Sequence, residues 1–146
     1  MPQQIDELLA ILALEDLGGH EFRGEHPSTN MQRSFGGQVL AQALAAAYRT
    51  IHDERLCHSL SGYFLRPGST SGPIDYHVTA TRDGRGFSTR RVVAEQDGRD
   101  IFVCSGSFKV PEPGLEHQMA PYSPPVPPSE CPPLADVLAR SSRAGR

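Results

Sequence analysis

The sequence predicts an α+β fold in which an antiparallel sheet curls around one long helix. Two observations lead to this prediction. Apolar residues cover nearly the whole circumference of the segment from Val39 to Ile51, which is typical of a buried helix. Four segments rich in β-branched and aromatic residues then follow, separated by turn dipeptides. A sheet wrapped around such a helix is the hotdog fold, although other α+β packings fit the same pattern.

The residues before the long helix predict a short helix, a strand and a polar loop. Apolar residues recur at helical spacing at Ile5, Leu8, Leu9 and Leu12. We expect this amphipathic helix to lie on the surface and to be stopped by Gly18 and Gly19. A first strand is expected from His20 to Gly24, and the polar loop EHPSTNMQRS leads from it to the long helix.

Four consecutive antiparallel strands are expected after the long helix. They correspond to the segments CHSLSGYFLR, PIDYHVTATR, FSTRRVVAEQ and RDIFVCSGSFKV. The dipeptides Pro67-Gly68, Asp83-Gly84 and Asp97-Gly98 separate them as turns. From Ile74 to Thr81, apolar and polar residues alternate, so that strand should have one covered face and one wetter face.

The C-terminal part of the chain differs sharply in composition. Nine of the thirteen prolines lie between Pro111 and Pro133, which is typical of a linker. We therefore predict a folded domain at residues 1–110, a proline-rich linker at 111–133, and the start of a truncated or shortened C-terminal segment at 134–146. Leu134, Val137 and Leu138 can begin a helix in this last segment.

Composition excludes several classes of protein. A chain of 146 residues has room for one compact domain, and a net charge of −3 argues against binding nucleic acid through the overall field. Acidic residues near the N-terminus and the lack of a long apolar run predict a cytoplasmic protein without a signal peptide or membrane span. The three cysteines have no metal-binding spacing, so we interpret them as reduced thiols and expect no metal site.

Four motifs carry a resemblance to a known family. They are RSFGGQVLAQAL, CHSLSGYFLRPG, TRDGRGFSTRRVVAEQDGRDIFVCSGSF and PEPGLEHQ. Together they resemble the N-terminal hotdog of the acyl-CoA thioesterase II (TesB-like) family, in order and spacing, from Phe22 to Gln118. The resemblance implies hydrolysis of fatty acyl-CoA to free fatty acid and CoA by water, without a cofactor. It also implies that full-length relatives carry two hotdogs joined by a proline-rich linker.

The start of the long helix is the first candidate site. Gly36 and Gly37 lack Cβ atoms, so a ligand carbonyl can approach free N–H groups where the helix dipole favours negative charge. Such N–H groups can form an oxyanion hole for a thioester. The alternative is that the glycines permit a tight turn or close packing. Gln38 and Gln42 can present amides to the substrate or to a partner hotdog, or be satisfied amides in an interface.

The remaining candidates lie on the predicted strands and their turns. We group His58 with Gly37 and Gln38 as catalytic, because it can orient or polarise the substrate near the helix start, although a lone strand histidine is usually structural. Arginine suits the phosphates of CoA through its fork of donors. Besides Gly36 and Gln42, the predicted substrate-binding residues are Arg66, Arg85, Phe87, Ser88 and Arg90. Solvated hairpin charge is the alternative for Arg85 and Arg90.

The long helix lacks a general base, since no Asp or Glu occurs between Gly36 and Ile51. The resemblance implies that the water-activating aspartate lies in the second hotdog. One hypothesis is therefore the N-terminal half of an acyl-CoA thioesterase, and the other is a non-catalytic module that binds acyl-CoA or completes a partner's site. A hotdog hydratase needs a histidine paired with a carboxylate, and no convincing pair is found. We expect a homo-oligomer, at least a dimer, or a C-terminal hotdog partner, because one hotdog exposes an edge strand.

Overall fold

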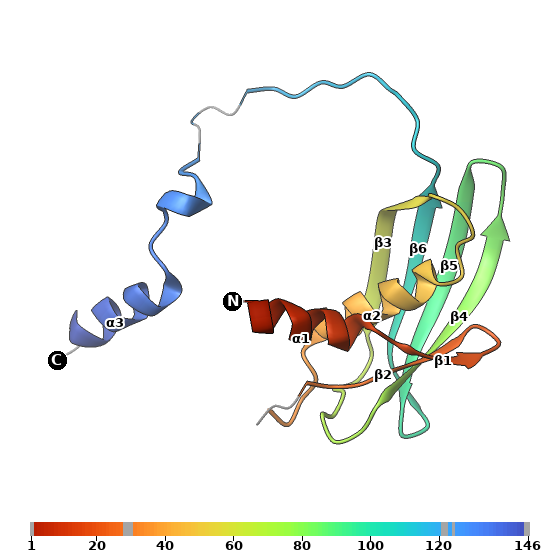
Figure 1. Cartoon of the computed structure of the whole chain (residues 1–146), viewed down its shortest axis with the longest axis horizontal. Coiled ribbons are helices and arrows are strands. Elements are labelled where there is room, and N and C mark those ends of the chain that lie inside the picture. The colour runs from red at the N-terminus through yellow and green to blue at the C-terminus, as the bar shows by residue number, and fades with distance from the viewer. Residues whose placement is uncertain (1, 28–30, 121–122, 124, 145–146) are drawn as a thin grey trace. The chain divides into compact units, whose positions relative to one another are not determined.

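A computed structural model describes residues 2–27, 31–120, 123 and 125–144 of the chain (Figure 1). These residues form two compact units, which are divided between Glu112 and Pro113. The second unit consists of extended proline-rich segments, a short 3₁₀ turn at Pro128–Glu130 and the helix α3 at Leu134–Ala144. Leu134, Val137 and Leu138 of α3 are exposed.

The first unit contains two helices and one six-stranded antiparallel sheet (Figure 1). In chain order its elements are α1 (Pro2–Leu12), β1 (Glu15–Gly18), β2 (Glu21–Gly24), α2 (Gly36–Tyr48), β3 (Leu56–Phe64), β4 (Ile74–Asp83), β5 (Phe87–Gln96) and β6 (Arg99–Lys109). The strands lie in the order β1-β2-β4-β5-β6-β3. The sheet curls around α2, so the predicted hotdog fold is confirmed.

The position of β3 differs from the prediction of four strands paired consecutively. β3 pairs with β6, where Leu60 lies opposite Gly106, and it has no contact in the sheet with β4. After β3 the chain donates from the N–H groups of Leu65 and Arg66 to the carbonyl of Ile101. The Pro67-Gly68 turn therefore begins a crossover to the other side of the sheet and is not the tip of a hairpin.

The strand predicted from His20 to Gly24 is present as β2, but the prediction lacks β1 and therefore the hairpin that the two strands form. Gly18, Gly19 and His20 all have positive φ angles, of 84°, 63° and 67°, and they turn the chain from β1 back into β2. The two glycines that we expected to stop the first helix thus form a hairpin turn, and the helix ends earlier, at Leu12. The predicted Asp97-Gly98 turn is confirmed, because both residues adopt the left-handed conformation that a two-residue hairpin needs.

The core lies between α2 and the concave face of the sheet. Small residues of α2, namely Ala43, Ala46 and Ala47, let the helix approach the sheet closely, and they are fully or almost fully buried. The alternation predicted for β4 is confirmed from Ile74 to Val78, where Ile74, Tyr76 and Val78 point into this core, but it ends there because Ala80 is exposed. The helix is not buried all round, however, because its opposite side is only partly covered in the isolated chain.

Candidate functional site

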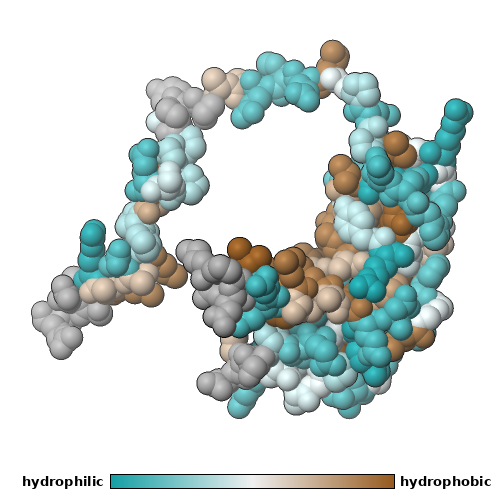
Figure 2. All heavy atoms as spheres, viewed as in Figure 1, coloured by the Kyte–Doolittle hydropathy of each residue, from teal (hydrophilic) through white to brown (hydrophobic). Residues whose placement is uncertain are grey.

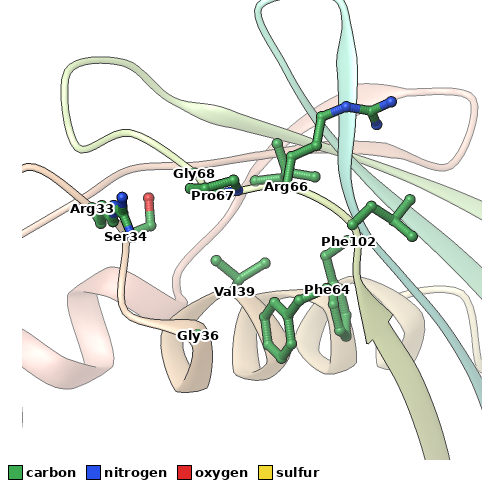
Figure 3. A pocket seen from close by; sticks show the side chains of 11 residues that line it. Arg33, Ser34, Gly36, Val39, Phe64, Arg66, Pro67, Gly68 and Phe102 are labelled. Carbon is green, nitrogen blue, oxygen red and sulfur yellow. The ribbon is translucent and has the colours of Figure 1, made fainter.

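A cavity of about 360 Å³ lies at the start of α2 (Figure 3). Figure 3 shows Val39 pointing from the helix toward the Pro67-Gly68 turn, with Phe64 and Phe102 at the side formed by the sheet. The loop that enters α2 supplies the opposite wall. The cavity is therefore mainly apolar at its base and has arginine side chains at its margin, from residues 33 and 66.

The loop that enters α2 is held against the crossover that follows β3. The N–H of Ser34 donates to the carbonyl of Gly68 at 3.0 Å, and its hydroxyl donates to the carbonyl of Ser69 at 2.8 Å. A Cβ atom on Gly68 would lie 2.9 Å from the Ser34 hydroxyl oxygen, so this close approach depends on glycine. These contacts fix the start of the helix relative to the sheet.

The start of α2 presents two free backbone donors. The N–H groups of Gln38 and Val39 both donate to the carbonyl of Phe35, whereas those of Gly36 and Gly37 donate to no described residue. Phe35 at the N-cap provides no side-chain hydrogen bond. The positive end of the helix dipole is therefore uncompensated there, as an oxyanion site requires. The alternative explanation for the glycines, close packing, also holds at Gly36, because a Cβ atom on this residue would lie 3.0 Å from the Phe64 ring.

Gln38 lies beside a histidine that the sequence analysis did not single out. Its amide nitrogen donates to the carbonyl of Glu25 at 3.1 Å and lies 3.2 Å from Nδ1 of His26. Burial lowers the pKa of His26 below its usual 6.5, although Glu25 and Gln38 act in the opposite direction. His26 therefore favours its neutral form next to the helix start. No local pattern in the polar loop distinguishes this histidine from the others.

Gln42 lies inside the fold, in contrast to the predicted contact with substrate. Its exposure is 0%, its amide oxygen accepts from the Tyr76 hydroxyl at 2.7 Å, and its nitrogen donates to the carbonyls of Ile11 and Glu25. Burial raises the pKa of Tyr76, which stays protonated as the donor. The amide of Gln42 joins α1, β4 and the end of β2, and both donor hydrogens are already used.

Arg90 and Ser88 are also buried, at the other end of α2 from Gly36. Arg90 is 1% exposed and donates to the side chain of Thr50 at 2.7 Å, to the Thr50 carbonyl at 3.0 Å and to Asp83 at 2.8 Å. The Ser88 hydroxyl donates to Asp83 at 2.6 Å. These hydrogen bonds, first from Ser88 and then from Arg90, lower the pKa of Asp83. Ser88 and Arg90 were predicted to contact the substrate, whereas in the structure they form hydrogen bonds within the protein.

The isolated chain does not bring His58 to the helix start. Its Nε2 lies 2.9 Å from the Ser107 hydroxyl and its ring is 5.7 Å from that of Phe87, on the sheet face opposite α2. The neighbouring Cys57 N–H donates to the Tyr48 hydroxyl at the last residue of α2. His58 and Phe87 thus lie near the end of the helix. Arg85, in the turn between β4 and β5, lies at this end too, since its carbonyl accepts from Arg55.

A second cavity, of about 510 Å³, adjoins the first and extends to the turn between β5 and β6. Arg66 lines both cavities, Arg33 lines the first, and Arg99 lines the second together with Asp97. Arg66 is held in place by donating to the carbonyl of Asp100 at 2.6 Å. None of the three arginines forms an ion pair with a residue that the structure describes. Of the predicted arginines, the structure therefore brings Arg66 to the cavity at the helix start. Arg33 lines the same cavity and Arg99 lines the adjoining one.

Within residues 2–27, 31–120, 123 and 125–144, no three His, Cys, Asp or Glu side chains gather as metal ligands. The helices in these ranges are all too short or too polar to cross a membrane.

Comparisons with known proteins agree with this architecture. Residues 25–109, more than half of the chain, match the family described as the acyl-CoA thioesterase N-terminal domain. Acyl-CoA thioesterase 2 of Haemophilus influenzae is 42% identical over 118 residues, which cover 81% of this chain and 41% of that protein. The chain spans less than half the length of the curated relatives that it matches.

Solved structures give the same result. The acyl-CoA thioesterase II TesB2 from Mycobacterium marinum superposes with a TM-score of 0.70 and is 41% identical, over 82% of this chain and 45% of that one. A protein from Alicyclobacillus acidocaldarius, described as having a hotdog fold, superposes with a TM-score of 0.72 at 26% identity, over 86% of this chain and 47% of that one. The chain therefore belongs to the acyl-CoA thioesterase family and contains its N-terminal domain.

Proposed function

We propose that this chain is one hotdog half of an acyl-CoA thioesterase that hydrolyses fatty acyl-CoA to a free fatty acid and CoA. The observation that carries the proposal is the start of α2, where Gly36 and Gly37 leave two N–H groups free beside a cavity. The relatives named acyl-CoA thioesterases support the same reaction.

The free N–H groups act on the carbonyl oxygen of the thioester. When water attacks the carbonyl carbon, the electron pair of the C=O bond moves to this oxygen, and the two donors stabilise its negative charge. The carbonyl then reforms, the C–S bond breaks, and CoA leaves as a thiolate that takes up the proton lost by water. Before this step, a base must accept the proton from the attacking water, and the base then delivers it to the thiolate. Because Gly36–Ile51 holds no carboxylate, we assign the base to a second hotdog.

A second candidate function is a non-catalytic module that binds acyl-CoA or completes a partner's site. The absence of a carboxylate from Gly36 to Ile51 favours it. Gly37→Val in this chain separates the two functions once a hotdog that carries the base is supplied. Turnover should fall if the N–H groups of this chain hold the thioester, and it should stay unchanged if this chain only binds acyl-CoA or completes the partner's site.

We propose that Arg33, Arg66 and Arg99 bind the phosphate groups of CoA, in place of the predicted Arg85 and Arg90. Replacing Arg66 and Arg99 together by alanine is expected to weaken CoA binding by roughly tenfold or more, because each removes a charge-assisted hydrogen bond. It should also flatten the dependence of affinity on salt. Calorimetric titration with CoA at two ionic strengths measures both effects.

Arg85→Ala is the matched control, because Arg85 is an exposed arginine at the other end of α2. We expect it to leave CoA binding unchanged. If Arg85→Ala weakens binding while the double variant does not, the phosphates lie at the hairpin between β4 and β5 and the present assignment is wrong.

We further propose that β3 pairs with a second hotdog, either another copy of this chain or a C-terminal partner. β3 is an edge strand with only β6 as a neighbour, and Tyr63 and Phe64 on it are largely exposed. Sedimentation equilibrium at tens of micromolar is expected to show a dimer or larger assembly. Tyr63→Glu should shift it toward monomer, whereas Leu17→Glu, an exposed apolar residue on β1 at the opposite edge of the sheet, should not. A monomeric unmodified chain would contradict self-association.

We place this activity in the cytoplasm. The support is the state of the three cysteines, Cys57, Cys104 and Cys131, which are all free, as is usual in a reducing compartment. Burial raises the pKa of the Cys104 thiol to about 11, which keeps it protonated and unreactive. Recovery of the protein in a secreted or membrane fraction would contradict this placement.

A further inference from the structure

An apolar groove of about 310 Å³ lies between α1 and the outer side of α2. Leu8, Ile11 and Leu12 of α1 form one wall, and Phe35, Gly37 and Ala41 form the other. Figure 2 shows hydrophobic residues gathered along these two helices. The groove contains no charged side chain among its lining residues, and the amide nitrogen of its polar residue, Gln38, already donates to a carbonyl.

The two walls of the groove are fixed to each other at one end. The buried amide of Gln42 on α2 donates to the carbonyl of Ile11 at 2.8 Å, near the end of α1. Earlier in α1, Leu8 and Leu9 are 57% and 60% exposed, so α1 keeps apolar surface in water beside the groove. An apolar surface that borders a proposed reaction centre indicates an apolar ligand.

The groove and the arginine-lined cavities lie on different sides of the helix start. Gly36 lines the cavity beside Arg33 and Arg66, whereas the next residue, Gly37, lines the groove. Both glycines carry the free N–H groups. A ligand that places a carbonyl at these donors therefore has cationic side chains available in one direction and hydrocarbon surface in the other.

We propose that the groove between α1 and α2 binds the alkyl chain of the thioester ligand. This inference rests on the proposed function, and it identifies the surface that binds the acyl chain. The ring of Phe35 lies at the inner end of the groove, because a Cβ atom on Gly37 would be 2.5 Å from it. Phe35 is itself exposed, so the ring can be displaced when a chain enters beside Gly37.

Burial of hydrocarbon predicts how affinity depends on chain length. Each methylene group transferred from water to an apolar surface raises affinity by about fourfold when it is fully buried. A groove open on one side buries part of each group, so we expect a smaller but steady gain. The gain in affinity should stop once the alkyl chain of the ligand reaches beyond Leu8.

The test uses the full chain with CoA and with S-butyl-CoA and S-dodecyl-CoA, thioethers that cannot be hydrolysed. The unmodified chain should bind the dodecyl compound at least tenfold more tightly than CoA. Leu8→Glu should remove most of this gain by placing a carboxylate in the groove, and it should leave the affinity for CoA itself unchanged. Leu9→Glu is the matched control, since Leu9 is equally exposed on α1 but does not line the groove.

The outcomes separate this inference from the function on which it rests. If the unmodified chain binds CoA and Leu8→Glu keeps the full gain from the dodecyl group, the alkyl chain lies elsewhere and the inference is wrong. If the unmodified chain binds neither CoA nor the thioethers, the proposed function fails. If circular dichroism shows that Leu8→Glu does not fold, Ala41→Phe takes its place in the same binding test. It fills the groove without adding charge and should lower the affinity for the dodecyl compound only.

Discussion

Joined to a C-terminal hotdog of the same family, this chain is expected to hydrolyse acyl-CoA with a kcat/KM about 10²–10⁴-fold higher than it shows alone, the usual contribution of general acid–base catalysis. The start of α2 supplies two backbone donors but no base, because the helix from Gly36 onward carries no carboxylate. Some turnover should remain in the short chain, since donors alone stabilise the oxyanion.

The measurement is the steady-state release of free CoA, trapped with a thiol reagent, from a medium-chain and a long-chain acyl-CoA. The short chain and the extended chain are assayed in parallel. In the extended protein, Gly37→Val should reduce kcat, because its side chain displaces the exposed Phe35 ring and occupies the space beside the N–H groups that the carbonyl oxygen must approach. This variant tests whether the higher kcat/KM of the extended protein depends on the N–H groups at the start of α2.

Equal kcat/KM for the two proteins would end the half-enzyme proposal. A base within this chain would then be required, and Asp53, Glu54 and His58 are the candidates that remain from the sequence. The structure makes each of them distant from the helix start in the isolated chain. Asp53 forms an ion pair with Arg55 at 2.8 Å after the end of α2, and His58 lies on the opposite face of the sheet. With equal kcat/KM, a second copy of this chain would therefore have to supply the base to the helix start of the first.

Local patterns explain why most elements could be predicted. The periodicity of apolar residues identifies a helix or a strand from within a few residues, and it located α2 and the four long strands. Pairing between strands depends on contacts far apart in the chain. Nothing near Leu60 indicates that its neighbour is Gly106, so the place of β3 at the sheet edge could not be read from the sequence. The strand predicted from His20 to Gly24 corresponds to β2, but its partner β1 was missed because it has only four residues, all of them exposed.

The same distinction applies to the candidate site. Gly36 and Gly37 could be predicted because a helix start is a local feature. Arg33, Arg66 and Arg99 come from three separate segments, and only the folded chain places them around adjoining cavities. Arg90 is different, because a local signal was available. The alternation of β5 places residue 90 on the same face as Val92 and Ala94, which are buried. That period indicates a buried arginine rather than a surface ligand.

Replacing Arg90 by alanine is accordingly expected to lower the free energy of unfolding by about 3 kcal/mol, whereas Arg85→Ala should change it by less than about 0.5 kcal/mol. The guanidinium of Arg90 is buried and supplies hydrogen bonds to the hydroxyl and the carbonyl of Thr50, which is itself buried. Its removal leaves these acceptors without a donor, at a cost of about 1–3 kcal/mol each, and it also leaves a cavity.

Urea denaturation followed by circular dichroism measures the difference, with an unchanged m-value as the sign that both variants unfold from the same native state. Arg90→Lys separates charge from geometry, because lysine keeps the charge but not the planar fork that reaches Thr50 and Asp83 together. We expect it to be destabilised as well. If Arg90→Ala proves as stable as Arg85→Ala and instead weakens CoA binding, Arg90 contacts the ligand in solution, and the network that joins the end of α2 to β4 and β5 contributes little to stability.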